Sequence, residues 1–215
     1  MQLIGMLDSP YVRRVAVALI VARVPFDHKP ISLFRHVDVF SKINPLLKAP
    51  TLVLDDGTVL MDSSIILEEL AAAFPRVAAL VPVPRAPRVL AARIMGIALT
   101  VMEKAVQRHY ERALRPPEKA HEPWVERVMR QLNCGLAALD AELPRADWIA
   151  GEDLGLADIT AACAAGFVRG TLLAEDVDFG RWPALSDFCA RAEALPAFRA
   201  APHADGVTAP LAIAD

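Results

Sequence analysis

The chain has 215 residues, which is enough for one large domain or two small ones. Hydrophobic residues make up 54% and charged residues 23%, so the chain has enough apolar material for a core and is not of the disordered class. The formal net charge of −3 gives no electrostatic basis for binding nucleic acid, and we expect no nucleic-acid partner.

The three cysteines are widely spaced, at positions 134, 163 and 189, without a Cys-x-x-Cys pair or a Cys/His cluster. We therefore expect no metal site and no dithiol redox chemistry. The first ten residues carry no basic segment, and the longest uninterrupted apolar run, residues 15–22, is too short to span a bilayer. These observations predict a cytoplasmic protein without a membrane partner.

The first 75 residues alternate short apolar runs with helical periodicity. The apolar runs predict four strands, at residues 3–7, 26–33, 51–54 and 58–61. Helical spacing predicts three helices, which begin at Pro10, Arg35 and Ser63. The last two strands flank Asp55-Asp56-Gly57, a strong hairpin signal. The order β-α-β-α-β-β-α indicates an α/β domain built on a mixed sheet.

Residues 76–87 include Pro82, Pro84 and Pro87 and show no regular period, so we interpret them as a linker. After the linker only helical patterns occur, at residues 88–115, 122–143, 157–173 and 183–195. The sequence therefore predicts an α/β domain at residues 1–75, a linker at 76–87 and an all-α domain at 88–215.

Four motifs make this layout resemble a specific family. In chain order they are Ser9-Pro10-Tyr11, Asn44-Pro45-Leu46-Leu47-Lys48-Ala49-Pro50, Asp62-Ser63-Ser64-Ile65-Ile66 and residues 148–159. They resemble the turn before the first helix, the N-P-x-x-K-[VI]-P and [ED]-S-x-A-I signatures, and the opening of the sixth helix of cytosolic glutathione transferases. The resemblance is to bacterial-like, Ser-type members, and it implies a thioredoxin-like N-terminal domain followed by a helical bundle.

Glutathione is the co-substrate that this resemblance implies, and its thiol must be ionised to react. Lowering a thiol pKa from about 8.5 to about 7 takes about 2 kcal/mol, which one hydrogen bond to a charged group can supply. Ser9 offers such a hydroxyl at the start of a helix, and the resemblance implies that it is the catalytic residue. Two alternatives stay open: Tyr11 donates to the thiolate instead, or Ser9 only caps its helix.

The resemblance assigns the rest of glutathione to two other motifs. It places the γ-glutamyl carboxylate at Ser63, on a helix N-terminus, and the γ-glutamyl amine near Asp62. It pairs the cysteinyl backbone with Ala49, held by a cis Pro50, and the glycyl carboxylate with Lys48. The alternatives are that Ser63 is a plain helix cap, that Asp62 complements the helix dipole, and that Lys48 is a solvated surface residue.

The hydrophobic electrophile is expected to bind between the sheet domain and the long helix. The candidate lining residues are Tyr11, Met102, Val106, His109 and Tyr110. A helical stripe of this kind equally fits a core, so the alternative is that these residues pack inside the protein. Asp158 is predicted to stabilise the fold and not to act as an acid.

The function implied is a glutathione transferase that activates the thiol for attack on a hydrophobic electrophile, with a role in detoxification. The alternative is a non-catalytic binding or regulatory protein of the same fold. The resemblance also implies a two-fold homodimer, with apolar positions of the third and long helices at the interface. These positions are Leu67, Leu70, Ala71, Phe74, Leu90, Ile94, Ile97 and Val101. The alternative is a monomer in which they all pack internally.

Overall fold

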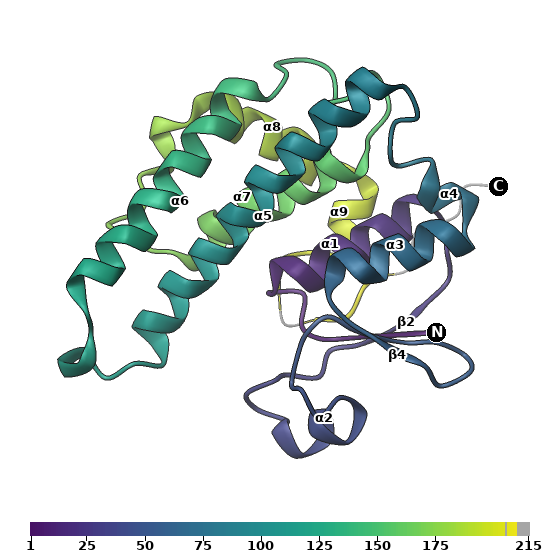
Figure 1. The fold of residues 1–215 in the computed structure, drawn as a ribbon, viewed down its shortest axis with the longest axis horizontal. Coiled ribbons are helices and arrows are strands. Elements are labelled where there is room, and N and C mark those ends of the chain that lie inside the picture. The colour runs from purple at the N-terminus through teal and green to yellow at the C-terminus, as the bar shows by residue number, and fades with distance from the viewer. Residues whose placement is uncertain (205, 210–215) are drawn as a thin grey trace. The chain divides into compact units, whose positions relative to one another are not determined.

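The computed structural model describes residues 1–204 and 206–209 (Figure 1). These residues form two compact units. The first, here called the sheet unit, contains Met1–Val81 together with the residues from Glu193 onward. The second, the helical unit, contains Pro82–Ala192. The two are described in turn.

A four-stranded sheet in the order β2-β1-β3-β4 is the centre of the sheet unit. Its strands are β1 (Gln2–Ile4), β2 (Asp27–Lys29), β3 (Thr51–Val53) and β4 (Val59–Leu60). β1 is parallel to β2 and antiparallel to β3, and β3 is antiparallel to β4. A parallel pair needs a crossover connection, which the first helix provides. The predicted βαβαββα order is confirmed.

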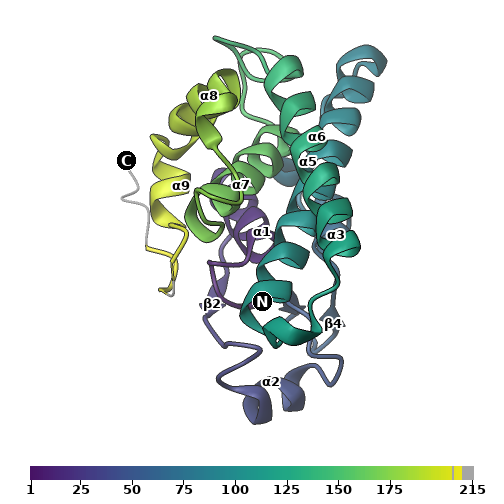
Figure 2. The same cartoon turned by 90° about the vertical axis from the view of Figure 1, so that its left-hand side faces the viewer.

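The helices of this unit lie on both faces of the sheet. They are α1 (Pro10–Val21), α2 (Val37–Ile43) and α3 (Ser63–Ala73). α1 and α3 pack together on one face, while α2 lies on the other (Figures 1 and 2). The apolar stripe of α1, which includes Val12, Val15 and Leu19, has no exposed surface. Its burial supplies the hydrophobic stabilisation of this layer.

The strands are shorter than the apolar runs that predicted them. β2 ends at Lys29 because Pro30 follows, and proline has no N–H to donate to the ladder. After β1 the chain turns at once: Gly5 has a φ of 137°, and the Ser9 N–H donates to the Met6 carbonyl at 3.2 Å. The remaining apolar residues of both runs therefore lie outside the strands.

Part of the predicted linker is helical. A short helix, α4 (Pro75–Ala78), begins with proline at its first position, where the missing N–H does no harm. The long helix α5 (Arg85–Ala113) begins three residues earlier than predicted. Residues 79–84 are therefore the only non-helical part of the predicted 76–87 segment.

The described residues from Glu193 onward belong to the sheet unit, whereas we predicted that residues 88–215 form the helical domain. A short helix that was not predicted, α9 (Pro196–Ala200), packs against α1. The guanidinium of Arg13, which is 1% exposed, forms two hydrogen bonds with the Glu193 carboxylate at 2.6 and 2.7 Å. Its Nε also donates to the Ala201 carbonyl at 2.7 Å. A buried cation needs such acceptors, so this contact ties the end of the chain to α1.

Four helices make up most of the helical unit. They are α5, α6 (Glu122–Glu142), α7 (Leu156–Thr171) and α8 (Pro183–Glu193), with single 3₁₀ turns at Pro117–Lys119 and Phe179–Arg181. α5 packs against both α6 and α7. At the α5–α6 contact, a Cβ on Gly135 would lie 2.7 Å from Val101 Cγ2, so only glycine allows this close approach.

Asp158 holds the start of α7 in place. Its carboxylate is fully buried and accepts hydrogen bonds from the backbone N–H groups of Ile149 and Gly155, both at 2.8 Å. Burial raises the pKa of this carboxyl, while the two N–H donors oppose the rise. Gly155 has no side chain to return the bond, so only the Asp158 half of a capping box forms. This is the fold-stabilising role predicted for Asp158.

Four of the eight predicted interface positions are buried within the chain, and Ala71, Phe74 and Ile97 are partly exposed. Leu67, Leu70, Ile94 and Val101 are at most 3% exposed, so they need no second subunit to cover them. Leu90 is exposed. The described helices include none that is long and apolar enough to cross a membrane.

Candidate functional site

Ser9 lies in the turn between β1 and α1 and is the N-cap of α1. Its Oγ is 3.4 Å from the Val12 N–H, a long and therefore weak capping bond. The hydroxyl acts as acceptor in this bond, which leaves its O–H to donate. Pro10, the first residue of the helix, has no N–H to compete for the Ser9 oxygen.

The second segment is the loop that precedes β3, and Asn44 organises it. This side chain is 1% exposed; its amide donates to Thr51 Oγ1 at 2.8 Å, and its Oδ1 accepts from the Leu46 N–H at 3.0 Å. Thr51 Oγ1 in turn donates to the Lys48 carbonyl at 2.6 Å. These bonds fix the backbone on both sides of Ala49. The asparagine of the motif therefore has a structural role.

The loop presents Lys48 on the surface. Ala49 is partly exposed and Pro50 is buried. The peptide bond between Ala49 and Pro50 is cis, as the resemblance implies.

The third segment lies at the start of α3, where Asp62 is the N-cap. Its Oδ1 accepts a hydrogen bond from the Ser64 N–H at 2.7 Å. The alternative that Ser63 is the helix cap is therefore wrong. Ser63 is the first residue of the helix and is 1% exposed. Its Oγ accepts a hydrogen bond from Arg14 at 3.0 Å.

The sheet topology brings the three segments to one edge of the sheet, the edge at which β1 and β4 end and β3 begins. Ser9 follows β1 and Ser63 follows β4, and both strands are antiparallel to β3. The end of β1 and the end of β4 therefore lie beside the start of β3, which Pro50 precedes. The register agrees, because Ile4 at the end of β1 lies opposite Thr51 at the start of β3.

The helices α1 and α3 both begin at this edge, so their N-termini lie there. Backbone N–H groups at a helix N-terminus favour negative charge. The edge therefore offers hydroxyl donors at Ser9 and Ser63, backbone groups at Ala49, and a carboxylate at Asp62. This set can bind a zwitterionic peptide and stabilise an anion beside Ser9.

The predicted electrophile-binding residues differ in burial. Met102 is fully buried, so it is a core residue and not a pocket lining. Val106 and His109 are partly exposed, and Tyr110 is 38% exposed on the same helix. Tyr11 belongs to the sheet unit, where it is partly exposed.

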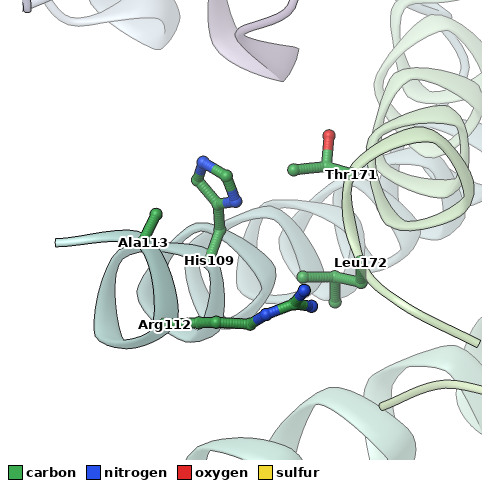
Figure 3. A pocket seen from close by; sticks show the side chains of 5 residues that line it. All are labelled: His109, Arg112, Ala113, Thr171 and Leu172. Carbon is green, nitrogen blue, oxygen red and sulfur yellow. The ribbon is translucent and has the colours of Figure 1, made fainter. Parts of the chain in front are cut away.

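His109 lines a cavity that lies within the helical unit, at the ends of α5 and α7 (Figure 3). The cavity has a volume of about 320 Å³, and its lining residues are His109, Arg112, Ala113, Thr171 and Leu172. Sequence analysis missed all of these except His109. Arg112 follows His109 by three residues and so lies on the same helix face, a signal that could have been used.

Two family models match the chain. The model described as glutathione S-transferase, N-terminal domain, matches residues 3–78, and the model for the C-terminal domain matches residues 97–196. The chain belongs to the glutathione S-transferase family. The fold and the family predicted from the motifs are thereby confirmed.

Solved structures of glutathione S-transferases resemble this chain over almost its whole length. A Methylobacterium radiotolerans enzyme in complex with glutathione sulfonate is 29% identical, with a TM-score of 0.85, covering 97% of this chain and 98% of the other. One from Methylobacillus flagellatus with glutathione bound is 28% identical, with a TM-score of 0.81, covering 93% and 98%. Among curated proteins, the maleylacetoacetate isomerase of Pseudomonas aeruginosa is 27% identical over 209 residues, 93% of this chain and 94% of the relative.

The described residues contain no group of three His, Cys, Asp or Glu side chains that could hold a metal ion. Arg14 is the residue of the sheet-unit site that sequence analysis missed. It is 1% exposed and contacts the Ser63 and Ser64 hydroxyls. Helical periodicity marks apolar residues as core, so it gave no reason to place an arginine there.

Proposed function

We propose that this chain is a glutathione transferase in which Ser9 activates the glutathione thiol for attack on a hydrophobic electrophile. One observation carries the proposal: Ser9, the loop before Pro50 and the start of α3 meet at one edge of the sheet, beside two helix N-termini. The family membership of the chain and the glutathione bound by related structures support it.

Ser9 stabilises the thiolate by donating its O–H. The Val12 N–H donates to the same oxygen, so this contact does not use the hydroxyl proton. The positive end of the α1 dipole adds to this stabilisation by about 0.3–1 kcal/mol. A hydrogen bond from Ser9 and the dipole together are enough to lower the thiol pKa to near neutrality. Tyr11, which lies two residues after Ser9 in the first turn of the same helix, is the alternative donor.

The remaining residues hold glutathione in place. Ser63 and the N–H groups at the start of α3 bind the γ-glutamyl carboxylate, and Asp62 pairs with the γ-glutamyl amine. The Ala49 backbone pairs with the cysteinyl residue, and Lys48 with the glycyl carboxylate. Fixing the thiolate at one position lowers the entropic cost of its reaction with an electrophile.

Isomerisation is a second candidate reaction, because one relative is named maleylacetoacetate isomerase. Conjugation and isomerisation both begin with the glutathione thiolate, so the proposed site on the sheet unit is compatible with either reaction. We further propose a homodimer that works in the cytoplasm in detoxification. The competing proposal is a glutathione-binding protein without catalysis.

The test is binding to immobilised glutathione followed by turnover of chlorodinitrobenzene. Elution by free glutathione and a rate above that of the uncatalysed reaction support a transferase. Elution without turnover favours the non-catalytic binder, and failure to bind contradicts both. The Ser9→Ala protein is the control for turnover, since it retains the residues assigned to binding.

A further inference from the structure

Gly5 lies where two segments of the proposed glutathione site meet. A Cβ on Gly5 would lie 2.6 Å from Val12 Cγ2 and 3.2 Å from Ala49 Cβ, so the residue fits between them only because it has no side chain. Val12 is the residue whose N–H bonds to Ser9 Oγ, and Ala49 is the residue assigned to the cysteinyl backbone of glutathione. The position of Gly5 therefore sets the spacing between Ser9 and Ala49.

Both backbone groups of Gly5 are bonded to β2. Its N–H donates to the Lys29 carbonyl at 3.0 Å, and its carbonyl lies 2.8 Å from His28 Nε2. His28 is 6% exposed, so water competes little for this bond. The imidazole therefore holds the peptide group that follows Gly5, where the turn towards Ser9 begins.

The proton on His28 is placed by a residue near the other end of the chain. Nδ1 accepts a hydrogen bond from the Thr208 N–H at 3.1 Å. The neutral ring then carries its proton on Nε2, which is the form that can donate to the Gly5 carbonyl. Thr208 thus favours the tautomer on which the bond to Gly5 depends.

Thr208 belongs to a segment here called the strap, residues 201–204 and 206–209, which is part of the sheet unit. The strap is also held by bonds that do not involve His28. The Ala201 carbonyl accepts from Arg13 Nε at 2.7 Å, and the Ala209 N–H donates to the Ala200 carbonyl at 2.7 Å. The Thr208 N–H is therefore presented to His28 by a backbone that is fixed on both sides.

We propose that His28 is a positioning residue for thiol activation, which links the strap to Gly5 and so keeps the Ser9 turn at a fixed distance from Ala49. The proposal rests on the proposed transferase function, because it concerns the hydroxyl that Ser9 offers to the thiolate. Without the bond to Gly5, the turn shifts relative to Ala49, and the Ser9 hydroxyl is no longer aligned with the thiol. His28 acts through Gly5 and not on glutathione.

The experiment measures the pKa of the thiol of bound glutathione, by ultraviolet titration, in variants of His28. His28→Leu removes both hydrogen bonds, and we expect it to raise this pKa by about one pH unit, because a misaligned hydrogen bond to the thiolate is weaker. His28→Gln places an amide donor at the position of Nε2 and should keep the wild-type value. His28→Asn reaches only the position of Nδ1, so it should behave like His28→Leu.

Lys29→Leu is the matched control. It makes the same change one position further along β2, where the Lys29 ammonium pairs with Asp27 at 2.7 Å on the surface, and it should leave the thiol pKa unchanged. Thr208→Pro removes the N–H that bonds to Nδ1, so it should raise the thiol pKa as His28→Leu does. Val207→Pro leaves that N–H in place and should not.

Urea unfolding of every variant separates positioning from stability. A raised thiol pKa in His28→Asn but not in His28→Gln supports the positioning role. A wild-type pKa in both His28→Leu and His28→Asn overturns it, and so does a thiol pKa that rises in proportion to the loss of stability in all variants, Lys29→Leu included. A wild-type protein that binds glutathione without lowering its thiol pKa contradicts the proposed function as well.

Discussion

Arg14 Nη1 donates a hydrogen bond to Ser63 Oγ at 3.0 Å, and both residues are 1% exposed. The same nitrogen lies 3.1 Å from Ser64 Oγ. Arg14 is on α1 and the two serines begin α3, so this contact links the two helices whose N-termini form the site. Because Ser63 Oγ accepts from Arg14, its O–H is left to donate, which is the orientation that a bound carboxylate requires.

We predict that Ser63→Ala weakens glutathione binding by roughly tenfold, because one charge-assisted hydrogen bond to the γ-glutamyl carboxylate is lost. Ser64→Ala is the matched control. It also removes a hydroxyl next to Arg14, but it leaves Ser63 intact. Calorimetry measures both. Equal losses in the two variants would mean that the effect comes from Arg14 and not from a direct contact of Ser63 with the ligand.

Ser9→Ala should leave the fold and glutathione binding intact while raising the pKa of the bound thiol by roughly one to two pH units, or about 1.4–2.7 kcal/mol. The reason is the loss of the hydroxyl donor at the start of α1. Ultraviolet titration of the thiolate measures the change. An unchanged pKa in Ser9→Ala, combined with a raised pKa in Tyr11→Phe, would assign the role to Tyr11.

Much of the fold could be predicted from local sequence signals. Ser9-Pro10 predicted where α1 begins, and the hairpin signal at Asp55-Asp56-Gly57 predicted β3 and β4. Topology then brings the predicted segments to one sheet edge. The order of the strands in the sheet, β2-β1-β3-β4, comes from the structure and was not predicted.

Contacts between distant residues could not be predicted in this way. Arg13 and Glu193 are 180 positions apart, and neither carries a local signal that it belongs with the other. The same holds for Arg14 and Ser63. Periodicity also could not separate core from pocket on α5, where Met102 is buried and His109 lines a cavity, because both lie among residues of helical spacing.

Asp158→Ala should destabilise the protein by about 2–4 kcal/mol, because it leaves two backbone N–H groups without their acceptor. Asp153→Ala, in the exposed part of the same loop, is the control and should change stability by less than about 0.5 kcal/mol. Urea unfolding measures both. Similar values for the two variants would contradict a fold-stabilising role for Asp158.

His28 should make stability depend on pH. Its Nε2 lies 2.8 Å from the Gly5 carbonyl, and its Nδ1 accepts from the Thr208 N–H at 3.1 Å. This arrangement requires a neutral ring, and burial lowers the pKa of His28 below its ordinary value of 6.5. The unfolded chain therefore takes up the proton first. Stability should be complete above about pH 6.5 and should fall as the pH drops towards the folded-state pKa.

The slope in this window should approach about 1.4 kcal/mol per pH unit for one proton. His28→Gln keeps a donor and an acceptor but does not titrate, so its stability should fall less steeply. The difference between the two slopes, from urea unfolding at several pH values, isolates His28 from the other histidines. Parallel curves would show that His28 makes no contribution.

The last prediction concerns assembly. Ile65 on α3 is 51% exposed, and Val89 and Leu90 on α5 are 55% and 41% exposed. Leu90 is a predicted interface position that the chain leaves exposed, and two-fold dimers are the most common soluble oligomers. Light scattering at micromolar concentration should therefore give twice the chain mass of 23.3 kDa. Leu90→Glu should shift the protein to the monomer, whereas Leu114→Glu, at the other end of α5 and 57% exposed, should not. A wild-type mass equal to that of one chain would contradict the dimer.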